Sequence, residues 1–360
     1  MLGLTIERFP PALPGFVAGA GGRGFGPADP AADAQREDRG GCPMRRQLLL
    51  LAACLCLGPQ SVRGQFLDTP AAPGGPGLGE VATQRYRVGV VVTAQGGPCS
   101  GIYATLPVPD DWPEQRVKIV EEKVSPEVRS VRYRTLAGGV KQMVVEIPDI
   151  PAGRQAEVIV TFALDRAAIT VPPATDGLRI PAKPDKTLKP FLAPSPYIES
   201  RHPKIVALAR ESGQGLDGWR KVEAIYDAVR EKVEYRNGEL KGAARALADG
   251  WGDCEELTCL FIAAARAEGI PARTVWVEGH CYPEFYLVNE AGSGWWFPCQ
   301  AAGTRAFGAM PDRLPILQKG DSFRDPDRPG KPLRYVSEFL KGAMTEGSGA
   351  PDVKWIREGA

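Results

Sequence analysis

Cys254 is the residue of this chain best placed to act as a nucleophile. Asp253 is a typical helix N-cap residue and Glu256 follows three residues later, as in a capping box, so we expect a helix to begin at Cys254. The unpaired N–H groups of a first helical turn carry partial positive charge, which favours a thiolate over a thiol. A cysteine held in this way is a candidate for covalent catalysis.

A cysteine nucleophile needs a nearby base, usually an imidazole, and a third group that orients the base. The chain has two histidines. His202 precedes Pro203, which biases it toward extended backbone just before a predicted helix and makes it the weaker candidate. His280 lies at the start of a predicted strand. If that strand packs beside the Cys254 helix, His280 can reach the thiol as its general base.

The elements around these residues alternate between helical and extended patterns. Apolar residues continue at helical spacing from Leu257 toward Glu268, and Gly269 with Pro271 is expected to end that helix. Further helical stretches are predicted near 205–209, 217–233 and 243–248, and extended runs at 273–278, 284–288 and 295–299, with 289–294 as a hairpin turn. Helices packed on an antiparallel sheet form an α+β domain.

Three motifs in this order resemble the transglutaminase-like superfamily, whose fold is related to that of papain-type cysteine peptidases. They are Gly252-Asp253-Cys254-Glu255-Glu256, then Gly269-Ile270-Pro271-Ala272-Arg273, then His280 with Glu284 and Phe285 where such proteins read His-Ala-Trp-x-Glu. The resemblance covers residues 216–304. It implies a papain-like core in which Cys254 is the nucleophile and His280 the general base.

Gln300 stands where the family usually has an Asp, at the end of the next strand. An amide can accept the imidazole N–H and hold its tautomer, but it cannot offset the imidazolium charge as a carboxylate would. With the hairpin turn centred near Glu290, His280 and Gln300 face each other across the two strands. Two outcomes stay open, a working site with a weaker Cys⁻/His⁺ pair or a degenerate, non-catalytic relative.

Aromatic side chains near these motifs are candidates for the wall of a cleft that holds an acyl or peptide substrate. We expect Trp251, Tyr282 and Trp296 to contribute to substrate binding, and Tyr282 stands where the family usually has Trp. Packing between helix and hairpin is the alternative role for such residues. Trp251, three residues before Cys254 in a turn flanked by glycines, is the best wall candidate.

Metal binding is the alternative chemistry, because His280, Cys281 and Cys299 are soft ligands on one hairpin. However, the chain has no Cys-x-x-Cys pair, and strand alternation is expected to point His280 and Cys281 to opposite faces. Cys259 lies off the face of Cys254 on their shared helix and is interpreted as a packing residue. We therefore predict no metal and no other cofactor.

The N-terminal segments carry targeting signals rather than fold information. Residues 1–43 are rich in Gly, Pro, Ala and Arg and are interpreted as disordered or as an over-extended start, whereas 44–64 has the charged start and short apolar run of a signal peptide. We therefore expect export to a periplasmic, cell-surface or secreted location. Membrane attachment would follow only if Cys54, in a lipobox-like sequence, is lipidated. Residues 65–83 are interpreted as a linker.

The remaining chain divides by pattern. Short Val- and Ile-rich runs over 84–168 predict a small all-β sandwich, 169–196 is a Pro-rich linker, 197–305 is the transglutaminase-like domain, and 306–360 is a C-terminal extension with one short helix at 335–341. The charge is balanced, with 44 basic and 43 acidic residues, so no nucleic-acid partner is indicated.

Two functions agree with these observations. The first is an exported cysteine-dependent acyl transferase or amide or peptide hydrolase, which acts on a protein or peptide substrate through a thioester on Cys254. The second is a catalytically degenerate binding or scaffold protein, in which Cys254 is inert. The sequence leaves the choice between transamidation and hydrolysis open.

Overall fold

The computed structural model describes residues 2–7, 74–344, 346 and 349–359. The predicted signal peptide 44–64 and Cys54 lie outside the described residues, as do most of 1–43 and the first part of the 65–83 linker. No helix in the described part of the chain is long and apolar enough to cross a membrane.

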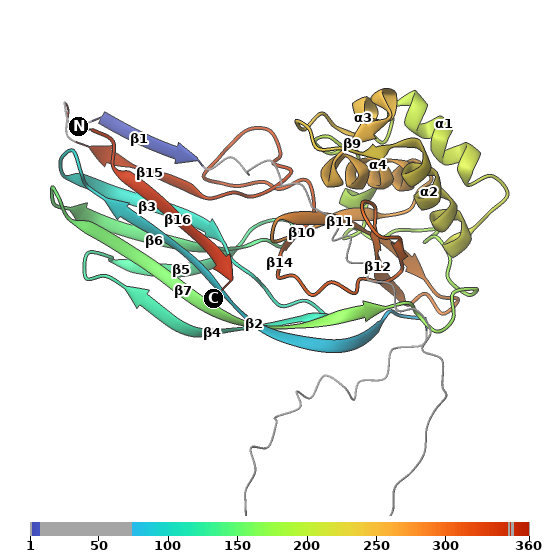
Figure 1. The fold of residues 1–360 in the computed structure, drawn as a ribbon, viewed down its shortest axis with the longest axis horizontal. Helices are drawn as coiled ribbons and strands as arrows, with labels where there is room; N and C mark the ends of the chain where they lie inside the picture. The colour runs from blue at the N-terminus through green and yellow to red at the C-terminus, as the bar shows by residue number, and fades with distance from the viewer. Residues whose placement is uncertain (1, 8–73, 345, 347–348, 360) are drawn as a thin grey trace, which may run out of the picture. The chain divides into compact units, whose positions relative to one another are not determined.

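Two antiparallel sheets share one apolar core (Figure 1). Their strand orders are β1-β15-β3-β6-β5 and β16-β2-β7-β4. The strands are β1 Leu2–Glu7, β2 Gly77–Thr93, β3 Cys99–Pro107, β4 Gln115–Val124, β5 Ser130–Thr135, β6 Lys141–Ile150, β7 Gln155–Thr170, β15 Phe339–Met344 and β16 Asp352–Gly359. In β2 the side chains of Tyr86, Val88, Val90 and Val92 are buried at every second position, as the period of a strand requires.

Two sequence interpretations are wrong at the chain's ends. Residues Leu2–Glu7, within the segment expected to be disordered, form β1 and pair with β15. The short helix predicted at 335–341 does not form, because from Phe339 onward the backbone is the strand β15, hydrogen-bonded between β1 and β3. Pairing on both edges with strands far away in the sequence outweighs a weak local helical spacing.

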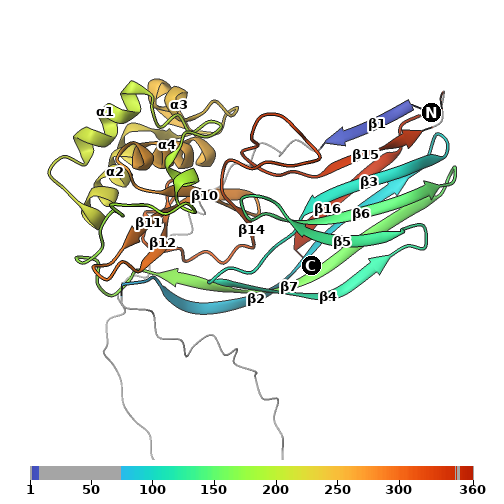
Figure 2. The ribbon, with the colours of Figure 1, turned by 180° about the vertical axis from the view of Figure 1, so that it is seen from behind.

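The second part of the described chain is the predicted α+β core. Its helices are α1 Pro203–Ser212, α2 Gly218–Lys232, α3 Ala243–Asp249 and α4 Cys254–Ala267, and its sheet has the order β13-β12-β11-β10-β14. The sheet strands are β10 Ala272–Val277, β11 His280–Val288, β12 Gly294–Gln300, β13 Ala306–Phe307 and β14 Ile316–Lys319. A short parallel pair, β8 Glu234–Tyr235 and β9 Trp251–Gly252, precedes α4. Figure 2 shows the helices gathered on one side of β10, β11 and β12.

Helix α4 is the centre of this core. Its residues from Cys254 to Arg266 are all buried, and it packs against the other three helices and against β10 and β11. Such a helix is apolar on most of its surface because it is covered all round. Its first turn is thereby fixed relative to the start of β11.

Polar residues join the core sheet to β4. The side-chain amide of the fully buried Gln115 donates from Nε2 to the Ile316 carbonyl oxygen at 2.9 Å and accepts from the Ile316 N–H at 2.7 Å. The Lys319 ammonium on β14 lies 2.6 Å from a carboxylate oxygen of Glu114 and 2.6 Å from one of Glu284. These buried groups satisfy each other, so the C-terminal extension predicted at 306–360 is part of the packed structure.

Candidate active site

The N-terminus of α4 holds Cys254 through the predicted capping box, which is confirmed. One carboxylate oxygen of Asp253 accepts from the N–H of Glu255 at 2.7 Å and of Glu256 at 3.4 Å, and the Glu256 carboxylate accepts from the Asp253 N–H at 3.1 Å. Gly252 is required here because a Cβ at its position would lie 2.5 Å from the Glu256 Cβ. Cys254 is therefore the first residue of the helix, in a turn fixed from both sides.

His280 and Gln300 lie together beside this turn. His280 is the first residue of β11, Gln300 the last of β12, and His280 Nε2 lies 3.0 Å from Gln300 Oε1. The imidazole also interacts with the Cys254 thiol, and this interaction raises the His280 pKa. The structure thus brings Cys254, His280 and Gln300 together, with His280 in contact with the other two.

The hairpin register differs from the predicted one. Val288 pairs with Gly294 and Glu284 with Pro298, so the turn is centred on Ala291 rather than near Glu290. A change of one residue at the turn shifts the pairing by two residues, so Gln300 lies diagonal to His280 rather than opposite to it. The long side chains still meet, because diagonal neighbours remain within reach of each other.

Helix α2 fixes the backbone of Gln300. Its carbonyl oxygen accepts from Tyr226 Oη at 2.8 Å and from Arg230 Nη1 at 3.0 Å. Arg230 also donates to the carbonyl oxygen of Ala301 at 3.0 Å. The backbone that carries the Gln300 side chain is therefore held by two side chains of α2, which limits its movement.

The site favours a thiolate at Cys254. A hydrogen bond from the Cys281 thiol, together with the hydrogen bond and charge of His280, lowers the Cys254 pKa from 9.0 to about 6, against the opposing effects of burial and the Asp253 charge. Burial alone would lower the His280 pKa, but hydrogen bonds to Cys254 and Gln300 and the charges of Cys254 and Asp312 raise it overall. The electrostatics therefore support a Cys254⁻/His280⁺ pair.

Cys281 is a site residue that the sequence analysis did not place beside Cys254. Its thiol donates to the carbonyl oxygen of Cys254, with the sulfur 3.8 Å from that oxygen. The expectation that strand alternation separates His280 from Cys281 is wrong, because both side chains contact Cys254. His280 is the first residue of β11 and follows Gly279, whose φ of 64° breaks the extended geometry on which alternation depends. The signal in the sequence is a Cys at the position where the His-Ala-Trp-x-Glu pattern has Ala.

The predicted substrate-binding residues occupy three different environments. Tyr282 is a core residue, 2% exposed, whose hydroxyl accepts from Arg166 at 3.3 Å, so its expected place in a cleft wall is wrong. Trp296 lies on the sheet face away from α4, in edge contact with Phe191 and with the Arg273 guanidinium 4.1 Å from its ring centre. The sheet therefore separates Trp296 from Cys254.

Trp251 remains beside the α4 N-terminus. Its half-buried ring lies between two cations, with Lys241 Nζ 3.0 Å and Arg236 Cζ 4.9 Å from the ring centre. Gly238 is required next to it, because a Cβ there would lie 2.6 Å from the indole. Trp251 is thus held rigidly in the strand that leads directly into the nucleophile's turn.

The C-terminal segment also reaches this turn. Arg334 forms an ion pair with Glu255, the residue after Cys254. Its guanidinium lies 5.8 Å from the ring centre of Tyr197 and 5.5 Å from that of Trp276. Tyr197 has a positive φ of 67°, the sole non-glycine residue of the described chain with one, and its side chain is 40% exposed. Such backbone strain is frequent at functional sites. Arg334 is far from Glu255 in sequence, so no local pattern could have indicated the pair.

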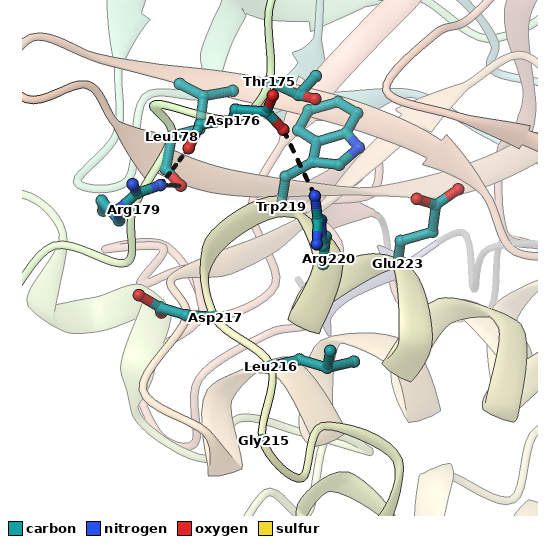
Figure 3. Close-up of a pocket in the computed structure, with 10 residues that line it drawn as sticks. All are labelled: Thr175, Asp176, Leu178, Arg179, Gly215, Leu216, Asp217, Trp219, Arg220 and Glu223. Carbon is teal, nitrogen blue, oxygen red and sulfur yellow. Dashed lines mark hydrogen bonds and ion pairs between the residues drawn. The ribbon is translucent and has the colours of Figure 1, made fainter.

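A polar cavity of about 520 Å³ lies elsewhere, around the start of α2 (Figure 3). Its lining includes Asp176, Arg179 and Trp219, and Arg220 forms an ion pair with Asp176 at 3.9 Å. None of Cys254, His280 and Gln300 lines it. The candidate active site is instead enclosed, with Cys254 and His280 each 3% exposed. No group of three or more His, Cys, Asp or Glu side chains within the described ranges is arranged to hold a metal ion.

Comparison with known proteins gives one family match and two structural neighbours. Residues 206–301 match the sequence model of the transglutaminase-like superfamily, which confirms the resemblance. A solved structure of a proposed cysteine protease from Cytophaga hutchinsonii is 19% identical, with 77% of this chain and 93% of that chain covered and a TM-score of 0.47. A proposed protease from Parabacteroides distasonis is 14% identical, with 64% and 48% covered and a TM-score of 0.24. No curated protein matches the chain.

Proposed function

Starting from a transglutaminase-like core, we propose that this protein is a cysteine-dependent acyl transferase or amide hydrolase that acts through a thioester on Cys254. One observation carries the proposal: His280 interacts with the Cys254 thiol and is hydrogen-bonded to Gln300, with 3.0 Å between Nε2 and Oε1. A nucleophile, its base and a group that orients the base are the minimum set for this chemistry. We further propose that the protein acts after export on a protein or peptide substrate.

The mechanism follows from these positions. The Cys254 thiolate attacks the carbonyl carbon of an amide and forms a C–S bond, while the carbonyl oxygen becomes an oxyanion near the backbone N–H of Cys254, the first of α4. His280 then gives its proton to the leaving amine as the C–N bond breaks, which leaves a thioester. A second amine or a water molecule loses a proton to His280 and attacks the thioester, and Cys254 is released. Transfer and hydrolysis differ only in this last acceptor.

Gln300 acts as a positioning residue in this scheme. Its Oε1 accepts the Nε2–H of His280 and leaves the other ring nitrogen to exchange protons with the thiol. Because Gln300 is neutral, the charge on His280 is balanced mainly by the Cys254 thiolate. Loss of the thiolate on acylation then lowers the His280 pKa, which helps the imidazolium to release its proton to the leaving group.

The test is direct capture of the acyl-enzyme. The full-length protein is incubated with p-nitrophenyl acetate, and intact mass spectrometry with peptide mapping locates the acetyl group. We expect one acetyl group on Cys254, and its transfer to a fluorescent primary amine or to water. Cys254→Ala should abolish the adduct. Cys259→Ala, which removes a buried thiol from the same helix, is the matched control and should retain it. An unmodified Cys254 would overturn the proposal.

The alternative is a binding protein whose Cys254 is inert. The enclosure of Cys254 and His280, each 3% exposed, favours this alternative, since a substrate must displace neighbouring groups to reach the sulfur. Reagents of increasing size distinguish the two functions. A site that reacts with small acyl donors and also with acylated peptides is an enzyme site, whereas reaction with neither supports the binding role.

A further inference from the structure

Two thiols lie in contact at the candidate active site. The Cys281 thiol donates to the backbone carbonyl oxygen of Cys254, with 3.8 Å between sulfur and oxygen, and it also interacts with the Cys254 thiol. No two cysteines of the described chain are joined by a disulfide. The nucleophile therefore has a reduced thiol as its immediate neighbour, which the proposed acyl transfer does not use as a reactant.

The surroundings give the two thiols different reactivity. Cys281 is 1% exposed and packs with Trp276 and Tyr335, and burial raises its pKa well above the ordinary value. Burial likewise raises the pKa of Cys259 and of Cys299, both in the core around α4. Because peroxides react with thiolates, Cys254 is the site of first oxidation, and Cys281 is the thiol placed to react with the product.

We propose that Cys254 and Cys281 form a reversible disulfide when the protein meets a peroxide, and that this bond switches off the site. The regulatory role of this disulfide rests on the proposed function, but the disulfide itself can form without any acyl transfer. It assigns Cys281 as a resolving cysteine. The hydrogen bond from the Cys281 thiol to the Cys254 carbonyl oxygen, which brings the two cysteines together in the reduced protein, is the observation that carries it.

The chemistry balances in two steps. The Cys254 thiolate attacks one oxygen of hydrogen peroxide, the O–O bond breaks, and the leaving hydroxide takes a proton to become water, so that Cys254 becomes a sulfenic acid. The Cys281 sulfur then attacks the Cys254 sulfur, the S–O bond breaks, and the hydroxide leaves as water with the Cys281 proton. Two thiols lose two electrons to one peroxide, and two water molecules form. A dithiol reverses the bond by exchange.

The disulfide inactivates Cys254 and also protects it from further oxidation. A sulfenic acid without a partner thiol is oxidised further to a sulfinic acid, which thiols cannot reduce. Closure of the bond needs the sulfurs to move from hydrogen-bond contact to about 2.05 Å, and the yield of the cross-link measures whether the core allows this movement. Wild-type protein should therefore recover its Cys254 reactivity after peroxide, whereas a protein without Cys281 should not.

The experiment uses the reduced full-length protein and hydrogen peroxide. After treatment, free thiols are alkylated with N-ethylmaleimide in denaturant, and non-reducing peptide mapping locates the cross-link. We expect a peptide pair joined through Cys254 and Cys281, a mass about 2 Da below that of the two reduced peptides, and full recovery of Cys254 labelling after dithiothreitol. Cys281→Ser should instead give Cys254 sulfinic acid, about 32 Da heavier and not restored by dithiothreitol.

Cys259→Ser is the matched control and should form the same cross-link as the wild type. The proposal is overturned if wild-type Cys254 becomes a sulfinic acid while Cys281 remains alkylated, or if Cys254 joins a different cysteine. The wild-type map decides this even if Cys281→Ser does not fold. A cross-link without acetylation of Cys254 would overturn the proposed function alone, whereas acetylation without a cross-link would overturn this proposal alone.

Discussion

Loss of either partner of the Cys254 sulfur should raise its pKa, and the effect at neutral pH is large. The Cys281 hydrogen bond and the hydrogen bond and charge of His280 lower this pKa from 9.0 to about 6, although burial opposes them. At pH 7, a pKa of about 6 leaves roughly 90% of Cys254 as thiolate, whereas a pKa of 9.0 leaves roughly 1%. Full loss of the stabilisation would therefore reduce the thiolate roughly 90-fold.

The assay is the rate of alkylation of Cys254 by iodoacetamide as a function of pH, read by peptide mapping. For the wild type we expect a midpoint near the pKa of about 6 and a plateau above about pH 7. His280→Ala and Cys281→Ala should each move the midpoint upward. Both variants should show a shift, because the Cys281 hydrogen bond is the largest single favourable contribution and His280 supplies two others. Burial remains in both variants and adds to the rise.

Two control variants separate this effect from general disturbance. Cys259→Ala removes another buried thiol of α4, and His202→Ala removes the other imidazole, so neither should move the midpoint. A wild-type midpoint at 8.5 or above would refute the reasoning. So would a low midpoint that neither His280→Ala nor Cys281→Ala changes, because the thiolate would then be stabilised by other groups.

Four further variants, at three positions, probe the supports of the site. Gln300→Ala should slow acetylation of Cys254 roughly 10- to 100-fold, because a misoriented base loses much of the usual 10²–10⁴-fold rate gain from general acid–base catalysis. Gln300→Asp should raise the upper pKa of the pH–rate profile. Equal acetylation rates for the wild type and both Gln300 variants would contradict a positioning role. Asp253→Ala should lower the free energy of unfolding by about 0.5–2 kcal/mol in urea titrations, with the alkylation midpoint unchanged or lower because the Asp253 charge raises the Cys254 pKa. Lys319→Met should cost about 3–5 kcal/mol at pH 7 because it leaves Glu114 and Glu284 buried without their cation. Burial alone would raise the Glu284 pKa, but Lys319 helps to hold it below its usual value. The stability lost in Lys319→Met should therefore shrink as the pH falls through the carboxylate range. A stability difference between variant and wild type that does not depend on pH would argue against the ion network.

The parts of the site that sequence predicted are those set by local rules. Asp253 and Glu256 are three residues apart, and the capping box that they form depends only on that spacing and on the backbone of one turn. The helix then ends near Gly269, whose φ of 75° is one that glycine adopts without strain. The helices and the hairpin of the core follow from the same kind of periodic signal, so their existence was predictable and their exact ends were not.

The parts that sequence missed depend on contacts between distant segments or on the ends of strands. Strand β15 forms because β1 and β3 pair with its two edges, and no property of Phe339–Met344 alone requires that. Arg334 forms an ion pair with Glu255, which lies 79 residues earlier in the sequence. Cys281 was misplaced because alternation is a rule for the interior of a strand, whereas His280 is the first residue of its strand.

Two of the departures from the family pattern act on the same proton equilibrium. Gln300 in place of a carboxylate removes a negative charge beside His280, which by itself disfavours the imidazolium and thus the Cys⁻/His⁺ pair. Cys281 in place of Ala adds a hydrogen-bond donor to the Cys254 sulfur, which favours the thiolate irrespective of the charge on His280. The thiolate at this site is therefore stabilised by Cys281 as well as by His280. A Gln300→Asp, Cys281→Ala double variant tests this compensation: its Cys254 pKa should lie below that of Cys281→Ala alone, because the restored carboxylate stabilises the imidazolium that stabilises the thiolate. Equal midpoints for these two variants would mean that residue 300 has no influence on the nucleophile.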